Sequence, residues 1–590
     1  MGTLAGCLTE SLRRHPDRPA VAWQGRVLTY AELHAQAEAL AGELLRSGVR
    51  PGDRVVLYLE RSGPAVAAVH GCLMLGAVYV PVDPRNPWPR LQALLDDCKA
   101  AALVTEARLV PRKTKPSFGV RLILLDRAPR RSRTCLSSRR AKGSDPAYVL
   151  YTSGSTGGPK GVLMADRNAM AFVEWAEREF LLETGDRVAN LAPFQFDLSV
   201  FDIFNTCCAG ACLRIIPYPD SLFAGRIARF LIREKITVFY TVPSVLLSVA
   251  ALGSVRPGAF GRPAGPAAPG GGRTSSPCAF PDLRLLLFAG EVMPPRALSA
   301  WMTLAPNAVF YNLYGPTETN VCMSYQVPRP SPAGGAAIPI GRPLPGTAVR
   351  VVDEDGRGCG AGRKGELWIK GPTVMRGYAT GKGGLGKDGY YRTGDIVSLE
   401  KDGAYRFWGR RDDQVKVRGC RVDLKEVEAA LSGLAGVKAC AVSAVGDGEA
   451  RTLAAHVEPL SGRRVCEKGL LEALSGLLPP YMVPTRIVFR KALPRLATGK
   501  IDRRGLAESL KPDLPVAAVR RVLEEKVLRG RTLRDDESFW ASGALDSLDL
   551  LQFVHGLEQA FSIRIPEKDV TPEVFASLES VSCYLAKKVQ

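Results

Sequence analysis

A run of small hydroxyl and glycine residues, followed closely by a lysine, lies within residues 151–161 (YTSGSTGGPKG). Glycine permits close backbone approach, serine and threonine add hydrogen-bond donors, and lysine adds a mobile positive charge. Backbone N–H groups in such a loop can wrap an oligophosphate. The run follows a strand-like apolar segment at residues 147–150, and it is not a Walker A loop, because Pro159 precedes Lys160 and Gly161 follows it. The pattern favours a phosphate loop over the flexible linker that a bare Gly/Ser/Thr run indicates.

Four other short motifs follow this loop in chain order. They are residues 311–318 (YNLYGPTE), 391–395 (YRTGD), 409–419 (GRRDDQVKVRG) and 498–502 (TGKID). With the loop, they resemble the motifs of the adenylate-forming superfamily, which includes acyl-CoA synthetases, luciferases and the adenylation domains of nonribosomal peptide synthetases. Five matches in order across about 350 residues are far more specific than any single match.

The resemblance implies a site for ATP and Mg²⁺. It assigns the β- and γ-phosphates to a group of loop residues, namely Thr152, Ser153, Gly154, Ser155, Thr156 and Lys160. Thr317 and Glu318 would serve the α-phosphate and Mg²⁺, a hard cation that prefers oxygen ligands. Tyr314 would stack on adenine. Asp395 would accept two hydrogen bonds from the ribose, and Arg410 would be a second ribose contact.

Lys500 is the catalytic lysine that the resemblance implies, alongside Glu318 and Thr317. A carboxylate attacking the α-phosphorus of ATP joins two anions, so charge neutralisation and alignment are the main tasks. Lys500 would reach the substrate carboxylate and the bridging oxygen. It must leave before a thiol enters, and the family achieves this by rotating the C-terminal subdomain about a hinge that matches Asp412. Taken singly, Glu318, Asp395 and Lys500 could be a helix cap, a turn residue and a solvated lysine, but the ordered series favours the functional roles.

Asp197 lies between aromatic residues on the apolar run 194–204 (FQFDLSVFDIF). Burying an unpaired carboxylate costs roughly several kcal/mol, so an acid in this setting indicates a partner. In amino-acid-activating members of the family, the matching carboxylate binds the substrate ammonium, whereas fatty-acid ligases do not need it. Asp197 therefore favours an amino acid as substrate. Asp202, on the same run, is expected to cap a helix.

Mapping the family's amino-acid pocket onto this chain gives, besides Asp197 and Lys500, eight residues without charge: Leu198, Phe201, Tyr240, Leu287, Ala289, Leu313, Val321 and Cys322. An uncharged pocket disfavours a charged substrate side chain. The set resembles that of L-proline-activating ligases of pyrrole pathways, in which a flavin dehydrogenase oxidises the prolyl thioester. We expect L-proline as substrate. Alanine, valine and cysteine stay open as alternatives, as does an acyl- or aryl-CoA ligase-like enzyme, which would not need Asp197.

Residues 509–590 differ in character from the rest, with helical patterns at 516–528, 548–560 and 578–587. An Asp-Ser-Leu triplet that opens a helix is usually only an N-cap. With its flanking residues, this one resembles acyl and peptidyl carrier proteins, in which the matching serine, here Ser547, carries 4′-phosphopantetheine. The carrier implies a phosphopantetheinyl transferase as partner, and a flavin acyl-carrier dehydrogenase and a downstream synthase as further partners, in antibiotic-type secondary metabolism.

Strands that alternate with helices predict parallel α/β layers. Helices are expected at residues 4–14, 29–45 and 64–75, and strands at 54–59 and 78–82. The predicted fold class is α/β. We expect a large multi-subdomain adenylate-forming core at 1–411, a small mobile α+β C-terminal subdomain at 412–508, and an all-α carrier helix bundle at 509–590.

The net charge of +20 is concentrated, since residues 107–142 hold 12 Lys/Arg and one acid. Without interleaved aromatic residues, this segment favours a solvated loop over a nucleic-acid-binding arm. A second insertion, residues 255–281, is rich in Gly, Pro and Ala. We expect a cytoplasmic enzyme without nucleic acid or membrane partners, because we find neither a signal peptide nor an apolar run of ~20 residues. The cluster Cys207, Cys208 and Cys212 lacks zinc-site spacing and is expected to be buried.

Overall fold

The computed structural model describes most of the 590-residue chain. The residues outside the description are 1, 111–118, 127–142, 155–157, 254–278, 330–336, 382, 413, 418, 447–450, 461–464, 495–500, 502–504, 507–508, 510–515, 525–538, 540–546, 562–564, 567–568, 572–573 and 589–590. Most of the two insertions therefore lies outside the described residues. The chain divides into two compact units, one of residues 1–250 with 270–493 and one of residues 251–269 with 494–590.

A seven-stranded sheet, ordered β18-β8-β7-β4-β3-β5-β6, carries the phosphate loop between two of its strands. Its strands are β3 (Arg54–Tyr58), β4 (Val78–Val82), β5 (Ala102–Thr105), β6 (Arg121–Leu124), β7 (Pro146–Thr152), β8 (Lys160–Ala165) and β18 (Gly377–Tyr378). β7 and β8 pair antiparallel, while β3 to β6 are parallel neighbours. The predicted strands at 54–59 and 78–82 are confirmed, and their continuous burial fits a sheet that is covered on both faces.

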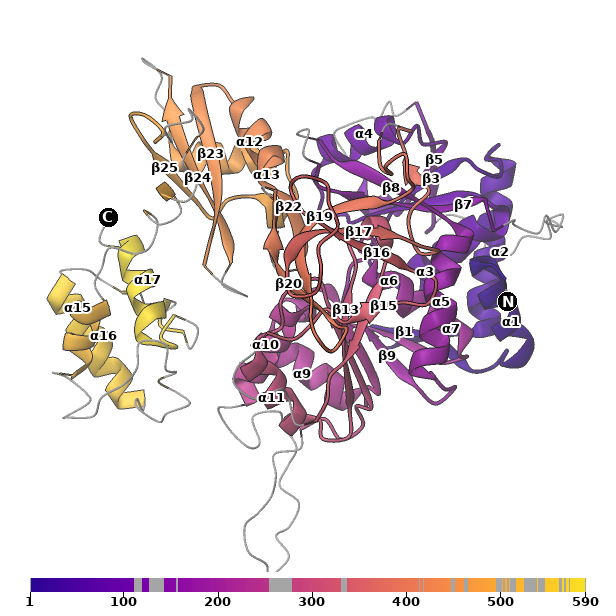
Figure 1. Ribbon diagram of the computed structural model, residues 1–590, viewed down its shortest axis with the longest axis horizontal. Coiled ribbons are helices and arrows are strands. Elements are labelled where there is room, and N and C mark those ends of the chain that lie inside the picture. Colours follow the sequence, from indigo (N-terminus) through magenta and orange to yellow (C-terminus); the bar gives the residue numbers. More distant parts are fainter. Residues whose placement is uncertain are drawn as a thin grey trace, which may run out of the picture. The chain divides into compact units, whose positions relative to one another are not determined.

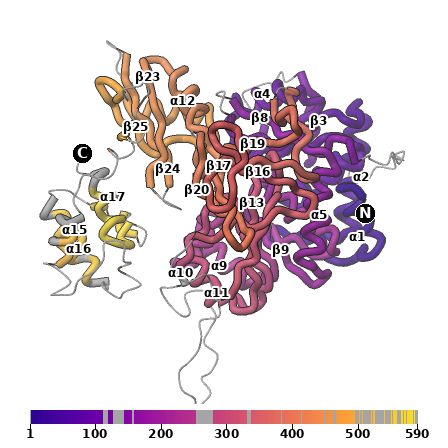
Figure 2. Tube along the Cα trace, in the orientation of Figure 1, coloured from indigo at the N-terminus to yellow at the C-terminus, as the bar shows by residue number. Residues whose placement is uncertain are grey.

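The N-terminal helices pack beside these strands. They are α1 (Leu4–Arg14), α2 (Tyr30–Arg46), α3 (Gly63–Leu75), α4 (Trp88–Asp97) and α5 (Asp166–Phe180). The predicted helix start at Thr29 is confirmed by a capping box: its hydroxyl accepts from the Glu32 N–H, and the Glu32 carboxylate accepts from the Thr29 N–H at 2.9 Å. α1 and α2 lie side by side (Figures 1 and 2).

A nine-stranded sheet has the order β15-β14-β13-β12-β11-β9-β10-β1-β2. Its strands are β1 (Pro19–Trp23), β2 (Arg26–Thr29), β9 (Arg187–Asn190), β10 (Cys212–Ile215), β11 (Val238–Thr241), β12 (Leu285–Ala289), β13 (Val309–Tyr314), β14 (Met323–Gln326) and β15 (Arg342–Pro343). β11, β12 and β13 run parallel, so their carboxyl ends meet at one edge.

Short helical segments connect the strands of this sheet. They are α6 (Leu198–Val200), the π-helical turn η2 (Phe201–Asn205), α7 (Thr206–Cys208), α8 (Tyr218–Ser221), α9 (Ala224–Arg233), α10 (Pro243–Gly253), α11 (Pro295–Leu304) and η3 (Thr317–Thr319); η1 (Ala107–Leu109) follows β5. Cys207, Cys208 and Cys212 are buried free thiols, as predicted.

The β-rich part is a four-stranded sheet of β16 (Ala348–Val352), β17 (Lys364–Lys370), β19 (Tyr391–Leu399) and β20 (Tyr405–Arg410). The pairing of β19 with β20 sets Asp395 opposite Arg410. The two predicted ribose contacts are therefore neighbours across one sheet.

The segment after Asp412 is an α+β layer, as predicted. It begins with the hairpin β21 (Gln414–Val417) and β22 (Cys420–Asp423) and continues through α12 (Leu424–Ser432), β23 (Val437–Val445), β24 (Thr452–Pro459), α13 (Glu467–Ser475), η6 (Pro480–Met482) and β25 (Arg486–Phe489). Apolar residues of both helices pack on the three-stranded sheet β23-β24-β25 in one core. β25 is a strand that the sequence pattern did not indicate.

The second unit contains α15 (Val516–Leu523), α16 (Ser547–Phe561) and α17 (Leu578–Lys588) among its described residues. They match the predicted helices in place, and α16 begins at Ser547. Phe553 makes edge-to-face contacts with Phe539 and Phe575, at centroid distances of 5.9 and 6.2 Å, in a core of their own.

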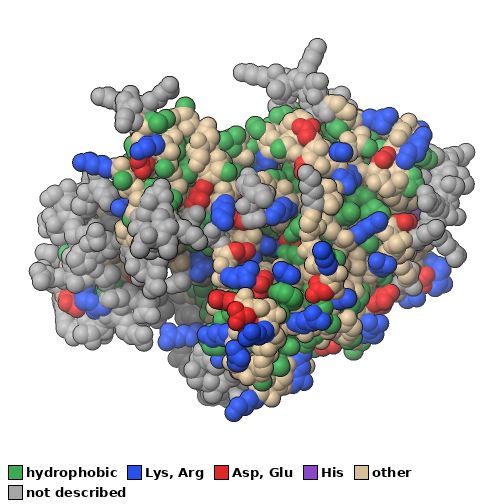
Figure 3. All heavy atoms as spheres, turned by 45° about the horizontal axis from the view of Figure 1, so that its top comes forward, with side chains coloured by type: hydrophobic (Ala, Val, Ile, Leu, Met, Phe, Trp, Pro, Cys, Tyr) green, Lys and Arg blue, Asp and Glu red, His purple; other side chains and the backbone are tan. Residues whose placement is uncertain are grey.

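Basic side chains are mixed with acidic ones on the described surface in Figure 3, and they do not gather into a single patch. None of the helices within the described ranges has both the length and the apolar character that crossing a bilayer requires.

Candidate active site

A cavity of about 750 Å³ lies where the strand ends meet, and it takes residues from four of the five motifs. Eleven predicted site residues line it: Thr152, Ser153, Asp197, Leu198, Tyr240, Ala289, Tyr314, Thr317, Val321, Asp395 and Arg410. Ala289 and Tyr314 end β12 and β13, so the parallel strands deliver their last residues to the cavity. The topology therefore brings together, around one cavity, segments that are hundreds of residues apart in the sequence.

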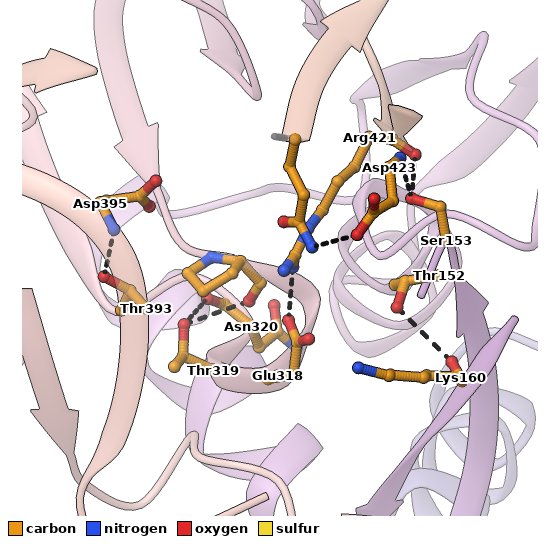
Figure 4. Close-up of polar contacts among 12 residues, drawn as sticks. Thr152, Ser153, Lys160, Glu318, Thr319, Asn320, Thr393, Asp395, Arg421 and Asp423 are labelled. Atoms are coloured by element: carbon orange, nitrogen blue, oxygen red, sulfur yellow. Dashed lines mark hydrogen bonds and ion pairs between the residues drawn. The ribbon is translucent and has the colours of Figure 1, made fainter. Parts of the chain in front are cut away.

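The phosphate loop leaves β7 at Thr152, whose hydroxyl approaches the Lys160 carbonyl at 3.5 Å (Figure 4). Position 154 requires glycine, because a Cβ there would lie 2.1 Å from the Gly158 carbonyl oxygen. Lys160, at the start of β8, has its ammonium 6.0 Å from the Tyr378 ring centroid. Ser155 and Thr156 lie outside the described residues.

Asp197 precedes α6 and lines the cavity, and Lys416 of the β21 strand, which also lines it, supplies an opposing charge. Burial raises the pKa of the Asp197 carboxyl, and Lys416 opposes that shift. Burial lowers the pKa of Lys416, and the negative charges of Asp395 and Asp197 oppose that shift. Sequence reasoning missed Lys416 as a site residue, although its position between two valines in the hinge motif indicated a lysine on an apolar strand.

Four mapped pocket residues do not line the cavity, so their contact with the substrate stays a prediction. Phe201, Leu287, Leu313 and Cys322 are buried in the layer behind the wall. Phe201 packs edge-to-face on Tyr240 at a centroid distance of 5.6 Å. Cys322 accepts a hydrogen bond from the Thr319 hydroxyl at 3.4 Å. Leu287 lies in the middle of β12, whereas Ala289, which lines the cavity, ends that strand.

Asp202 does not cap a helix, so that expectation was wrong. It lies inside the π-helical turn η2, has no exposed surface, and accepts a hydrogen bond from the Asn190 amide at 2.8 Å. Its other carboxyl oxygen has no hydrogen-bond partner among the described residues. Burial raises the pKa of Asp202 to about 8, so the group is largely protonated at neutral pH.

The two residues predicted to contact the ribose are paired with each other. Asp395 forms an ion pair with Arg410 and accepts a hydrogen bond from the Tyr314 hydroxyl. Arg410 also binds the carboxylate of Asp412 through two nitrogens, at 2.7 and 2.8 Å. The Arg410 guanidinium thus links Asp395, the predicted ribose contact, to Asp412, the predicted hinge residue.

Glu318 is a buried carboxylate, 1% exposed, and it fits the predicted Mg²⁺ ligand. One of its oxygens pairs with Arg421 at 2.8 Å (Figure 4). The other accepts a hydrogen bond from the Tyr378 hydroxyl at 3.2 Å. Burial disfavours its charged form, but Arg421 together with hydrogen bonds to the carboxylate outweighs burial and holds the pKa of Glu318 below its ordinary value. An ionised carboxylate supplies the oxygen ligands that a hard cation such as Mg²⁺ prefers.

The β21–β22 hairpin fills the side of the cavity next to the phosphate loop. The Ser153 hydroxyl donates to the Arg421 carbonyl at 2.8 Å and accepts from the Asp423 N–H at 2.9 Å (Figure 4). The Gly154 N–H donates to Glu426 at 3.2 Å. Sequence reasoning missed these contacts, which join segments about 270 residues apart.

Lys500 lies outside the described residues, so its predicted role is untested. The side chain of Ser547 is likewise outside the description, although α16 begins there.

Two family models match the chain, "AMP-binding enzyme" over residues 8–379 and "AMP-binding enzyme C-terminal domain" over residues 426–500. The first covers more than half of the chain, so this protein belongs to the AMP-binding enzyme family.

Within that family it is an adenylation domain of the nonribosomal peptide synthetase type, an ATP-dependent, AMP-forming ligase that activates an amino acid. A protein of Pseudomonas fluorescens named L-proline--[L-prolyl-carrier protein] ligase is 35% identical over 512 residues, which cover 85% of this chain and 98% of that protein. One of the same name from Streptomyces coelicolor is 34% identical, with coverages of 86% and 97%. Phosphinothricin tripeptide synthetase PhsC of Streptomyces viridochromogenes is 32% identical; the match covers 100% of this chain but only 54% of PhsC.

Solved structures agree on the fold. The crystal structure of IdnL1 matches with a TM-score of 0.66 and 29% identity, covering 84% of this chain and 99% of IdnL1. The Vibrio cholerae adenylation domain AlmE, solved with glycyl-adenosine-5′-phosphate, matches with a TM-score of 0.72 and 24% identity, covering 86% of this chain and 98% of AlmE. The predicted α/β adenylate-forming fold is therefore confirmed.

Proposed function

We propose that this chain activates L-proline with ATP to prolyl-AMP and pyrophosphate, and transfers the prolyl group to phosphopantetheine on its own Ser547. The observation that carries the proposal is the wall around Asp197. This carboxylate faces a cavity whose nearest mapped neighbours, Leu198, Tyr240, Ala289 and Val321, carry no charge. A small, apolar amino acid with a cationic nitrogen suits that wall. Two relatives that this chain matches over 97–98% of their own length are named as L-proline ligases, which supports the choice.

In the adenylation step, Asp197 holds the substrate ammonium and so fixes the direction of the carboxylate. That carboxylate attacks the α-phosphorus of ATP, the new P–O bond forms, and pyrophosphate leaves. We assign Asp395 and Arg410 to the ribose, Tyr314 to adenine and Thr317 to the α-phosphate. Mg²⁺ on Glu318, when bound, would neutralise phosphate charge. We assign Lys500 to the substrate carboxylate on the resemblance alone.

In the transfer step, the pantetheine thiol attacks the carbonyl of prolyl-AMP, a thioester forms, and AMP leaves. We propose residues 509–590 as the carrier domain, residues 412–508 as the subdomain that moves about Asp412, and residues 1–411 as the core. A phosphopantetheinyl transferase must first modify Ser547. A flavin acyl-carrier dehydrogenase and a downstream synthase would then consume the thioester. The cytoplasmic location stays a prediction.

An ATP–pyrophosphate exchange panel over the proteinogenic amino acids tests the substrate. We expect L-proline to give the highest kcat/KM, with alanine, valine and cysteine well below it. Exchange that ranks another amino acid first would remove the proline assignment. Formation of a CoA thioester from a plain carboxylic acid, without amino-acid-dependent exchange, would instead favour a CoA ligase.

A further inference from the structure

The backbone at Asn320 is strained, in the short turn between Glu318, the predicted magnesium ligand, and Val321, a mapped pocket residue. Asn320 has φ +49° and ψ −159°, a combination that is essentially restricted to glycine. Five non-glycine residues have positive φ in the part of the chain that the structure describes, and Asn320 is the one of them that is buried and lines the cavity. Such a conformation persists only where the surroundings enforce it, and at a site it indicates function.

The side-chain amide of Asn320 has a partner at each end. Its oxygen accepts a hydrogen bond from the N–H of Val321 at 2.8 Å, and its nitrogen donates to the hydroxyl of Tyr148 on β7 at 3.4 Å. Because only the oxygen can accept from an N–H, the contact with Val321 decides which way the amide is turned. Asn320 is 2% exposed, so removal of its side chain would leave a buried N–H at Val321 without this acceptor.

The backbone of the turn is held as closely as the side chain. The Thr319 hydroxyl donates to the Asn320 carbonyl at 3.0 Å (Figure 4). On the other side, a Cβ at position 315 would lie 1.6 Å from the same carbonyl oxygen, so Gly315 is needed where the chain folds back on itself. The strained residue therefore fixes the position of Val321, which follows it and lines the cavity.

Tyr148 connects this turn with the surroundings of Asp197. Burial raises the pKa of Tyr148, and the negative charge of Asp197 raises it further, so the hydroxyl stays protonated. Tyr148 is 1% exposed, and its ring lies against Tyr79 at a centroid distance of 5.4 Å. The nitrogen of the Asn320 amide is thus anchored on a side chain that is itself held within the core.

We propose that Asn320 is a positioning residue that sets the size of the substrate: its strained turn and its hydrogen bond hold Val321 at the wall next to the substrate side chain. The inference rests on the proposed binding of a small amino acid at Asp197. One methylene more or less in an apolar pocket changes kcat/KM by roughly 10–200-fold, so a small displacement of Val321 is enough to admit a larger substrate. Asn320 acts through Val321 and is given no catalytic role.

Pyrophosphate exchange with L-proline and with L-pipecolate, its ring homologue with one more methylene, tests this inference. In Asn320→Gly the backbone can keep its conformation, but the Val321 N–H loses its acceptor. We expect the preference for L-proline, as a ratio of the two kcat/KM values, to fall about fivefold or more, through the KM of the amino acids. The KM for ATP should stay within about twofold of the natural value. Tyr148→Phe should lower the same ratio by a smaller factor, because the amide keeps its oxygen contact and loses only the anchor of its nitrogen.

The matched control is Gln24, a second non-glycine residue with positive φ, which is exposed in the turn between β1 and β2 and does not line the cavity. Gln24→Gly should leave the ratio unchanged.

An unchanged ratio in Asn320→Gly overturns the inference, and so does an equal loss of kcat for both amino acids, which a merely structural role would give. If Asn320→Gly does not fold, an unchanged ratio in Tyr148→Phe overturns it. Should the natural protein prefer another amino acid, the ratio is measured for that amino acid and its homologue with one more methylene, so a wrong proline assignment leaves the test intact. A natural protein without amino-acid-dependent exchange would refute the proposed function itself, and the inference with it.

Discussion

At the scale of single residues, the site depends on carboxylates whose surroundings differ. Asp197 faces the cavity near Lys416, Glu318 is ionised against Arg421, and Asp202 is buried with one hydrogen-bond donor. Carboxyl groups within one small region can thus be held ionised by a cation or be kept protonated by burial.

Replacing Asp197 by Asn tests the first of these roles. The amide keeps the shape of the side chain but removes the charge that the substrate ammonium needs. We expect kcat/KM for the preferred amino acid to fall about 100-fold or more in pyrophosphate exchange, mostly through KM. Affinity for ATP alone, measured by calorimetry, should change little. An Asp197→Asn variant with natural exchange kinetics would contradict the role of this carboxylate.

Asp202 predicts a pH dependence of stability. Its pKa is about 8 in the folded chain and 3.8 in the reference state, so the folded protein holds this proton more tightly. The stabilisation from this group is complete below pH 3.8 and is lost as the pH rises to 8. The Tm of the natural protein relative to Asp202→Asn should therefore decline between pH 5 and 8. A difference in Tm that stays constant over this range would show that Asp202 does not titrate as inferred.

At the scale of elements, the β21–β22 hairpin is the part of the site that local pattern could not position. Its alternating residues and the N-cap at Asp423 are local features, and the hairpin and α12 follow from them. The contacts of Lys416, Arg421 and Glu426 are with distant segments, so no local signal placed them. By contrast, the predicted capping box of α2 and the buried runs of β3 and β4 were correct, because neighbouring residues decide them.

Gly419 at the turn of this hairpin gives a prediction at the same scale. It has φ +78°, its N–H contacts Glu291, and a Cβ there would lie 2.6 Å from Val242. We expect Gly419→Ala to destabilise the packing of the hairpin against Val242 by about 1–3 kcal/mol. Transfer to the carrier should then slow more than pyrophosphate exchange. Adding Val242→Ala should restore part of the transfer rate; equal loss in both half-reactions would count against a specific role for the hairpin.

At the scale of the whole molecule, motif order was enough to predict the family, and the comparisons confirm it. Sequence reasoning was less successful with the pocket. Phe201, Leu287, Leu313 and Cys322 were mapped to the pocket, but they are buried and do not line the cavity, because which buried residues reach a cavity depends on the packing of distant segments. The three helices α15, α16 and α17 fall where their apolar patterns predicted, while the carrier role of residues 509–590 and the attachment of phosphopantetheine to Ser547 stay predictions.

The most direct measurement is the intact mass of the phosphopantetheinylated protein after incubation with ATP, Mg²⁺ and L-proline. The account predicts a gain of one prolyl group on the pantetheine arm, no gain in Ser547→Ala, and removal of the gain by a thioesterase or hydroxylamine. If the protein exchanges pyrophosphate in the presence of L-proline but never carries a prolyl group on Ser547, the claim that it loads its own carrier is wrong.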